Sequence, residues 1–132
     1  MIRAVLADSG PLYAAIDEGD KHHGQALEDL QKLVDDRRDI LVLYPILLDA
    51  HNLVLSRLGT KAALRWLTEM ASVALMNPTP EDYNQAHAML RGLPDQRISL
   101  FNATVAVIAT RTRLDVWTYD HHFDVMRVPV WR

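Results

Sequence analysis

The sequence predicts one α/β domain with three layers, α/β/α, in which helices cover both faces of a parallel five-stranded sheet. Three observations lead to this fold class. Short apolar runs of strand length alternate with longer segments of helical periodicity. The chain has 132 residues, of which 49% are hydrophobic, and this suits one domain with a substantial core. No linker, internal repeat or low-complexity segment interrupts the chain, so residues 1–132 are expected to form a single domain.

Five apolar runs have the length of strands and are bounded by charged residues, proline or glycine. The first ends at Asp8 and the fourth ends just before Asp120. Pro129 predicts that the fifth is an edge strand, because proline is tolerated at the edge of a sheet. The five predicted strands are residues 1–8, 40–44, 73–76, 116–119 and 128–130.

Six helices are predicted between these strands. The clearest start is at residues 79–82, where a threonine cap, a proline and two first-turn acids follow one another. Pro11 and Pro45 also fit the first turn of a helix, and Gly59 ends the helix that Pro45 opens. The last helix has no charged residue from Leu100 to Thr110, so it is expected to be buried on most of its surface. The predicted helices follow residue 10 and cover residues 22–34, 45–58, 60–70, 80–91 and 99 onward.

Composition excludes several classes of protein. The absence of cysteine excludes disulfides, thiolate zinc sites and a cysteine nucleophile. The net charge of −3 argues against a strongly basic nucleic-acid binder, although a metal-dependent nuclease brings its own cations to the phosphate. No apolar run approaches the roughly 20 residues of a membrane span, and the N-terminus does not have the pattern of a signal peptide. We therefore expect a cytoplasmic protein that is not bound to a membrane.

Four polar side chains are expected to converge at one edge of the sheet. In open parallel sheets, ligands bind beyond the carboxyl ends of the strands, where Asp8 and Asp120 stand. Asp49 lies on the apolar side of its helix, and Asn102 lies in the first turn of the most buried helix. Several hard oxygen ligands in one place favour Mg²⁺ or Mn²⁺, which would activate water and neutralise phosphate charge. These residues predict a metal site that acts on a nucleic-acid phosphate.

The chain resembles the PIN-domain family and, within it, the VapC-like toxins of bacterial toxin–antitoxin pairs. The resemblance covers nearly the whole chain and rests on the order and spacing of six short motifs. They are Leu6-Ala7-Asp8-Ser9, Asp20-Lys21-His22-His23, Pro45 with Asp49, Thr79-Pro80-Glu81-Asp82, Ile98-Ser99-Leu100-Phe101-Asn102-Ala103 and Trp117-Thr118-Tyr119-Asp120-His121-His122-Phe123.

The resemblance implies a PIN-like fold with strand order 3-2-1-4-5 and a shared acidic site. Asp8 and Asp120 match the family's acids after the first and fourth strands, and Ser9 matches a small hydroxyl position that often helps to orient the first acid or a metal-bound water. Asp49 stands where the family usually has Glu, and Asn102 stands where it has Asp. The amide at 102 removes one negative charge, which should weaken metal binding and reduce turnover. The sequence does not decide whether Asn102 arose by drift or was introduced on purpose.

The implied function is a Mg²⁺- or Mn²⁺-dependent endoribonuclease toxin that forms a homodimer and is silenced by a cognate antitoxin. The alternative is a catalytically inactive PIN-like module that binds antitoxin or RNA, and DNA cleavage by the same chemistry is a third possibility. Candidates for contacts with the substrate backbone are Arg57, Arg65 and Arg97, and Asp124 is a candidate for a contact at the rim of the site.

Each of these residues also has a purely structural explanation. Asp8 could cap the following helix, Asp120 could be a turn residue, and Asp49 could pair with an arginine. Ser99 and Asn102 are spaced as in a capping box. Asp124 could lie in a solvated turn, and Asp95 could only order Arg97. The histidine pairs 22–23 and 121–122 lack other ligands at zinc spacing, so a histidine metal site is not expected.

Overall fold

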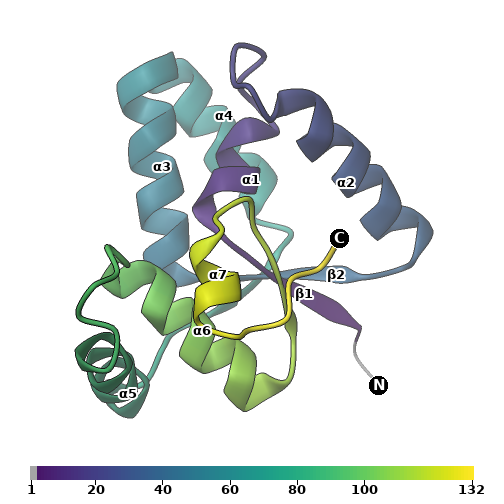
Figure 1. The fold of residues 1–132 in the computed structure, drawn as a ribbon. Helices are drawn as coiled ribbons and strands as arrows, with labels where there is room; N and C mark the ends of the chain where they lie inside the picture. Colours follow the sequence, from purple (N-terminus) through teal and green to yellow (C-terminus); the bar gives the residue numbers. More distant parts are fainter. Residues whose placement is uncertain (1–2) are drawn as a thin grey trace.

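The structure, a computed structural model, describes residues 3–132, and within this range four strands form one parallel sheet (Figure 1). β1 (Ala4–Ala7) lies between β2 (Asp39–Leu43) and β4 (Asp115–Trp117), and β3 (Ala74–Met76) pairs with β2. The order β3-β2-β1-β4 confirms the predicted parallel sheet and the first four positions of its strand order. The predicted first strand, residues 1–8, was too long, because Arg3 and Asp8 lie outside β1; its residues 1 and 2 lie outside the described residues.

The predicted fifth strand is wrong in its extent. Residues 128–130 contribute one isolated parallel bridge, between Val130 and Val116 of β4. The Val116 N–H donates to the carbonyl of Pro129 at 2.9 Å, and its carbonyl accepts from the Trp131 N–H at 2.8 Å. To extend this parallel pairing toward the N-terminus of β4, the next backbone hydrogen bond would need an N–H donor at position 129, and proline has none. The segment therefore occupies the fifth position of the sheet without forming a ladder.

The helices form two groups. α1 packs against α2 and α3, and α3 packs against α4, whereas α5 packs along α6, which also contacts β4 and α7. In Figure 1 the first group lies above the strands, and α5 and α6 lie lower. Helices on both sides of the sheet agree with the predicted three layers. The bounds are α1 (Ser9–Ala14), α2 (His23–Asp35), α3 (Tyr44–Leu58), α4 (Thr60–Met70), α5 (Pro80–Arg91), α6 (Leu100–Thr112) and α7 (His122–Val125).

Local chemistry explains where the helices begin and end. Thr79 and Asp82 form the predicted capping box, because each side chain accepts the backbone N–H of the other, at 3.1 and 2.9 Å. The carboxylate of Asp82 also accepts two bonds from Arg111 of α6, at 3.0 and 2.8 Å, and so joins α5 to α6. Gly59, with a φ of 94°, separates α3 from α4 in a conformation that side chains disfavour. Within α6 every residue from 103 to 109 is buried, as predicted, whereas Leu100, Phe101 and Thr110 at the two ends of the uncharged run are exposed.

Several boundaries differ from prediction by one to a few residues. Tyr44, predicted as the end of a strand, is the first residue of α3. Thr118 and Tyr119 lie beyond β4, because the Thr118 hydroxyl accepts the Asp120 N–H at 3.0 Å and the backbone turns there. The predicted turn after Asp120 contains the short helix α7. No helix in residues 3–132 is long and apolar enough to cross a membrane.

Candidate functional site

The carboxyl ends of β1 and β4 bring the predicted acidic residues to one place. The two strands are hydrogen-bonded neighbours, with Ala7 opposite Trp117, so the chain segments that follow them leave the same edge of the sheet. Asp8, Asp49, Asn102 and Asp120 all line one open cavity of about 470 Å³, and Ser9 lines it with them. Four separate segments of the chain therefore supply the four predicted ligands.

Asp8 is buried and fixed by two hydrogen bonds. Its side chain accepts the Ser9 N–H at 2.8 Å, which makes it the N-cap of α1, and accepts the Thr118 hydroxyl at 2.8 Å. Burial raises the pKa of this carboxyl, the two hydrogen bonds oppose the rise, and the negative charges of Asp120 and Asp49 add to it. Asp8 is therefore both the N-cap of α1 and a residue of the acidic cavity.

Thr118 links the two acids and was not predicted as a site residue. Its hydroxyl donates to Asp8 and accepts the Asp120 N–H, and the residue is 7% exposed. The spacing of a threonine two residues before an acid is the signal in the sequence for such a turn. Thr118 thus fixes the position of Asp120 relative to Asp8.

Both oxygens of Asp120 also have donors. Its Oδ1 accepts the His122 N–H at 2.9 Å and lies 2.9 Å from His122 Nδ1, and its Oδ2 accepts Asn102 Nδ2 at 2.7 Å. Asp120 is therefore both a turn residue, through its bond to the first residue of α7, and part of the cavity wall. About a third of its side chain is exposed, at 33%, so it stays open to a ligand.

Of the two hydrogen bonds of the predicted capping box between Ser99 and Asn102, one is present. The backbone N–H of Asn102 donates to Ser99 Oγ at 3.1 Å, which makes Ser99 the N-cap of α6. The side chain of Asn102 does not return to the cap and instead donates to Asp120. A carboxylate at this position could not make that bond, because an ionised carboxylate is only an acceptor.

The predicted arginines lie in different places. Arg57, at the end of α3, lines the acidic cavity, and its guanidinium lies 5.0 Å from the centre of the Tyr13 ring. Arg65 lines a separate cavity of about 220 Å³ beside α4. Arg97 and Asp95 are exposed in the loop before α6 and line neither cavity. Among these candidates, Arg57 has a position from which it can reach a phosphate at the acids.

The histidine pairs have different surroundings. His23 bonds through Nδ1 to the carbonyl of Ala14 at 2.7 Å, so it has a structural role. Asp120, His121 and His122 have ligand atoms within 4.8 Å of one another, a grouping that could hold a metal ion. His121 is 79% exposed at its side chain. This grouping differs from the prediction that the histidine pairs take no part in a metal site, because its three ligand residues are adjacent in sequence.

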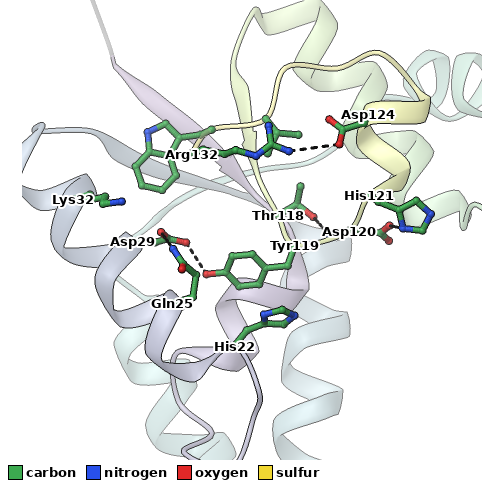
Figure 2. A pocket seen from close by; sticks show the side chains of 12 residues that line it. His22, Gln25, Asp29, Lys32, Thr118, Tyr119, Asp120, His121, Asp124 and Arg132 are labelled. Carbon is green, nitrogen blue, oxygen red and sulfur yellow. Dashed lines mark hydrogen bonds and ion pairs between the residues drawn. The ribbon is translucent and has the colours of Figure 1, made fainter.

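A second cavity, of about 480 Å³, adjoins the first and shares His22, Tyr119 and Asp120 with it (Figure 2). Asp29 lies at its base, 5% exposed, and accepts hydrogen bonds from Trp117 Nε1 at 3.0 Å and from the Tyr119 hydroxyl at 2.7 Å. Burial and the bond to Asp29 raise the pKa of the Tyr119 hydroxyl, so the tyrosine remains neutral. Asp124 lines this second cavity and not the acidic one.

Asp29 was missed, although the sequence carries a signal for it. It falls three residues after Ala26 and four before Leu33, on the apolar face of α2, where a carboxylate needs partners. Asp20 was also not proposed as a site residue; it lines the acidic cavity, and its carboxylate accepts the His22 N–H at 2.8 Å.

The donor set of the acidic cavity fits a hard divalent cation. Asp8, Asp49 and Asp120 offer carboxylate oxygens and Asn102 an amide oxygen, which are ligands that Mg²⁺ and Mn²⁺ prefer. Burial is the main reason why the pKa of Asp8 is raised, and the smaller contribution from the charges of Asp120 and Asp49 would be relieved by a cation between the acids. Within residues 3–132, however, the ligand atoms of Asp8, Asp49 and Asp120 do not all lie within 4.8 Å of one another, so a shared ion would have to draw these carboxylates together.

Comparisons with known proteins place the fold. No model of a known family matches the chain, and no curated protein sequence matches it. VapC20 of Mycobacterium tuberculosis, a Sarcin-Ricin loop cleaving toxin, superposes with a TM-score of 0.84 at 20% identity, covering 98% of this chain and 99% of that one. VapBC2 from Rickettsia felis, bound to a DNA fragment from its promoter, gives 0.74 at 15% identity over 100% and 98% of the two chains. FitAcB from Neisseria gonorrhoeae gives 0.69 at 15% identity over 97% and 96%.

The chain therefore has the fold of these solved structures, which confirms the fold that the resemblance to PIN-domain proteins implied. At 20% identity or less, this likeness defines the fold, and the roles of individual residues rest on the geometry described above.

Proposed function

We propose that this chain is a Mg²⁺- or Mn²⁺-dependent endoribonuclease and the toxin of a toxin–antitoxin pair. The observation that carries the proposal is the convergence of Asp8, Asp49 and Asp120 with Asn102 in one open cavity at the carboxyl ends of β1 and β4. The likeness in fold to VapC20, a toxin that cleaves the Sarcin-Ricin loop, supports RNA as the substrate.

In this proposal, Asp8, Asp49 and Asp120 hold the metal ion, and the carbonyl oxygen of Asn102 completes the set. When bound, the ion would supply activation of a water molecule and neutralisation of charge on the phosphate and the leaving oxygen. The protein keeps Asp8 and Asp120 in position through the donors that already contact them. Arg57, held against the Tyr13 ring, is placed to contact a non-bridging phosphate oxygen.

The partner of such a toxin would be an antitoxin protein. The solved structures with this fold include VapBC2 and a toxin–antitoxin complex from Klebsiella pneumoniae, which support this part of the proposal. We also propose a homodimer. Its support is an apolar groove of about 210 Å³ at the start of α6, whose wall includes Leu100, which is 49% exposed, and Tyr83, which is 37% exposed.

A second candidate function is a catalytically inactive module that binds antitoxin or RNA. The hydrogen bond from Asn102 to Asp120 favours it, because the amide satisfies an acid that would otherwise need a cation. In this reading the cavity keeps its shape while its affinity for metal is low.

The deciding experiment is cleavage of an RNA hairpin with the Sarcin-Ricin loop sequence, in Mg²⁺ and in Mn²⁺. It compares the chain with Asn102→Asp and Asp8→Ala, and Asp95→Ala is the control for loss of an exposed acid outside the cavity. We expect cleavage by the chain or by Asn102→Asp, none by Asp8→Ala, and none in excess EDTA. Cleavage that survives EDTA would refute the metal mechanism, and a 2′-deoxy hairpin tests DNA as the substrate.

If only Asn102→Asp cleaves, the site is a nuclease centre that the amide disables. If none of the variants cleaves any RNA, the binding module is the better description.

A further inference from the structure

The two cavities of this structure are parts of one groove. They share His22, Tyr119 and Asp120, so a strand whose phosphate lies at the acids can continue directly into the second cavity (Figure 2). The proposed function uses the first cavity and leaves the second, of similar volume, without a role.

The ring of Tyr119 is held rigidly between the two cavities. Its hydroxyl donates to Asp29, which is itself fixed by Trp117 Nε1 and by Gln25 Nε2, the latter at 2.7 Å. The His22 ring lies beside it, with ring centres 4.7 Å apart. Figure 2 shows the Tyr119 ring above His22 and below Arg132, and Tyr119 lines both cavities. A fixed aromatic ring at the wall of a groove is a surface on which a nucleic-acid base can stack.

Lys32 is the cation of this cavity that has no ion-pair partner among residues 3–132. It stands three residues after Asp29 on α2 and is exposed. The opposite charges on the wall are already engaged. Asp29 accepts three donors, Asp120 accepts the Asn102 amide and the His122 N–H, and Asp124 lies 3.5 Å from Arg132 in an exposed pair. Lys32 is therefore free to bind an incoming anion.

From this geometry we propose that the second cavity binds the nucleotide next to the cleaved phosphate of a single-stranded RNA. Tyr119 stacks on its base, and Lys32 contacts the following backbone phosphate. The inference rests on the proposed function, since it places the cleaved phosphate at Asp8 and Asp120. Because every base has an aromatic face, this subsite adds affinity without strong sequence preference.

The first test measures binding of a fluorescein-labelled RNA octamer to the full chain by anisotropy, in Ca²⁺. Lys32→Ala should raise Kd about tenfold and lower the slope of log Kd against log salt by roughly 0.7, the value for one phosphate contact on a single strand. Lys61→Ala is the matched control, because Lys61 is an exposed lysine on α4 that lines neither part of the groove. Tyr119→Phe keeps the aromatic ring and loses only the bond to Asp29, so it should lose clearly less affinity than Tyr119→Leu, which should lose about tenfold.

The second test identifies the phosphate. One methylphosphonate at a time replaces a phosphate of the octamer, and binding is measured for the chain and for Lys32→Ala. At one position the neutral linkage should weaken binding by the chain but not by Lys32→Ala. The subsite is wrong if the effects of the methylphosphonate and of Lys32→Ala on RNA binding are additive at every position, or if Lys61→Ala loses as much affinity as Lys32→Ala. In either case the cavity is better explained as a binding site for a protein partner.

The two proposals can fail separately. RNA binding that shows no coupling to Lys32, together with metal-dependent cleavage, rejects the subsite and keeps the nuclease. Coupling to Lys32 without cleavage by the chain or by Asn102→Asp supports the subsite and rejects the nuclease. Absence of RNA binding rejects both.

Discussion

Thr118→Val tests whether the link between the two acids positions the site. The substitution keeps the shape of the side chain and removes the hydroxyl that donates to Asp8 and accepts from the Asp120 N–H. Both groups then lose a partner in a region where Thr118 is 7% exposed. An unpaired buried polar group costs about 1–3 kcal/mol, and the added methyl group contributes about 0.8 kcal/mol of burial. We expect a net loss of about 2 kcal/mol in the free energy of unfolding.

Thr118→Val should also weaken metal binding. Residues that orient metal ligands typically change affinity by about 10–100-fold, so we expect Mn²⁺ to bind at least tenfold more weakly to Thr118→Val. Thr118→Ser restores the hydroxyl and should recover most of the affinity, which a role in packing alone would not produce. The assays are urea unfolding followed by tryptophan fluorescence and isothermal titration with Mn²⁺.

Thr110→Val is the matched control, because the Thr110 hydroxyl bonds only to the carbonyl of Ala106 in its own helix, at 3.0 Å. It should change the free energy of unfolding by less than about 0.5 kcal/mol. If Thr118→Val unfolds at the same urea concentration as the chain and binds Mn²⁺ equally well, Thr118 does not position the acids and our account of the site is wrong.

Three further predictions concern the rest of the molecule. The bonds from Arg111 hold the pKa of Asp82 below its ordinary 3.8, so Asp82→Asn should lose about 2 kcal/mol of unfolding free energy at pH 7. This stabilisation disappears as the pH falls through the lowered pKa. The urea unfolding curves of the two proteins should therefore converge below pH 3.8. Leu100→Glu places an acid in the first turn of α6 and should convert the proposed homodimer to a monomer in sedimentation without unfolding it, whereas Leu64→Glu on α4 should not. Asp29→Ala leaves the donors of Trp117 and Tyr119 unpaired and should lower Tm by roughly 5–10 °C in calorimetry, and an unchanged Tm would contradict the burial of Asp29.

The elements that the sequence predicts well are those with strong local signals. The capping box at Thr79 and the uncharged run of α6 define their helices without reference to the rest of the chain. The boundaries that were wrong depend on contacts made elsewhere. The fifth strand required an N–H at position 129, and β4 ends early because Thr118 bonds to Asp120.

The place of Asp8 and Asp120 in one cavity could be predicted because strand ends in a parallel sheet meet at one edge, and that of Asp49 because it lies on the apolar side of its helix. Their partners could not be predicted, because a side-chain hydrogen bond between Asn102 and Asp120 joins positions 18 residues apart, and that between Tyr119 and Asp29 joins positions 90 apart. A single sequence gives the residue types of such pairs but not their distance. Asp29 is different, because the sequence already places it on the apolar face of a helix. The argument that made Asp49 a candidate therefore applied to Asp29 as well.

The bond between Asn102 and Asp120 has opposite effects on the empty and the metal-bound site. In Asn102→Asp, the donor at 2.7 Å from Asp120 is replaced by a second acceptor of like charge, so the protein without metal should lose about 2 kcal/mol of stability. The same change adds a negative ligand and should tighten Mn²⁺ binding, so added Mn²⁺ should raise Tm more in Asn102→Asp than in the chain. Calorimetry in EDTA and in Mn²⁺ measures both effects. Equal Tm values in EDTA together with equal Mn²⁺ affinities would place residue 102 outside the metal site. A lower Tm in EDTA without tighter Mn²⁺ binding would make Asn102 a structural partner of Asp120 and favour the binding module over the nuclease.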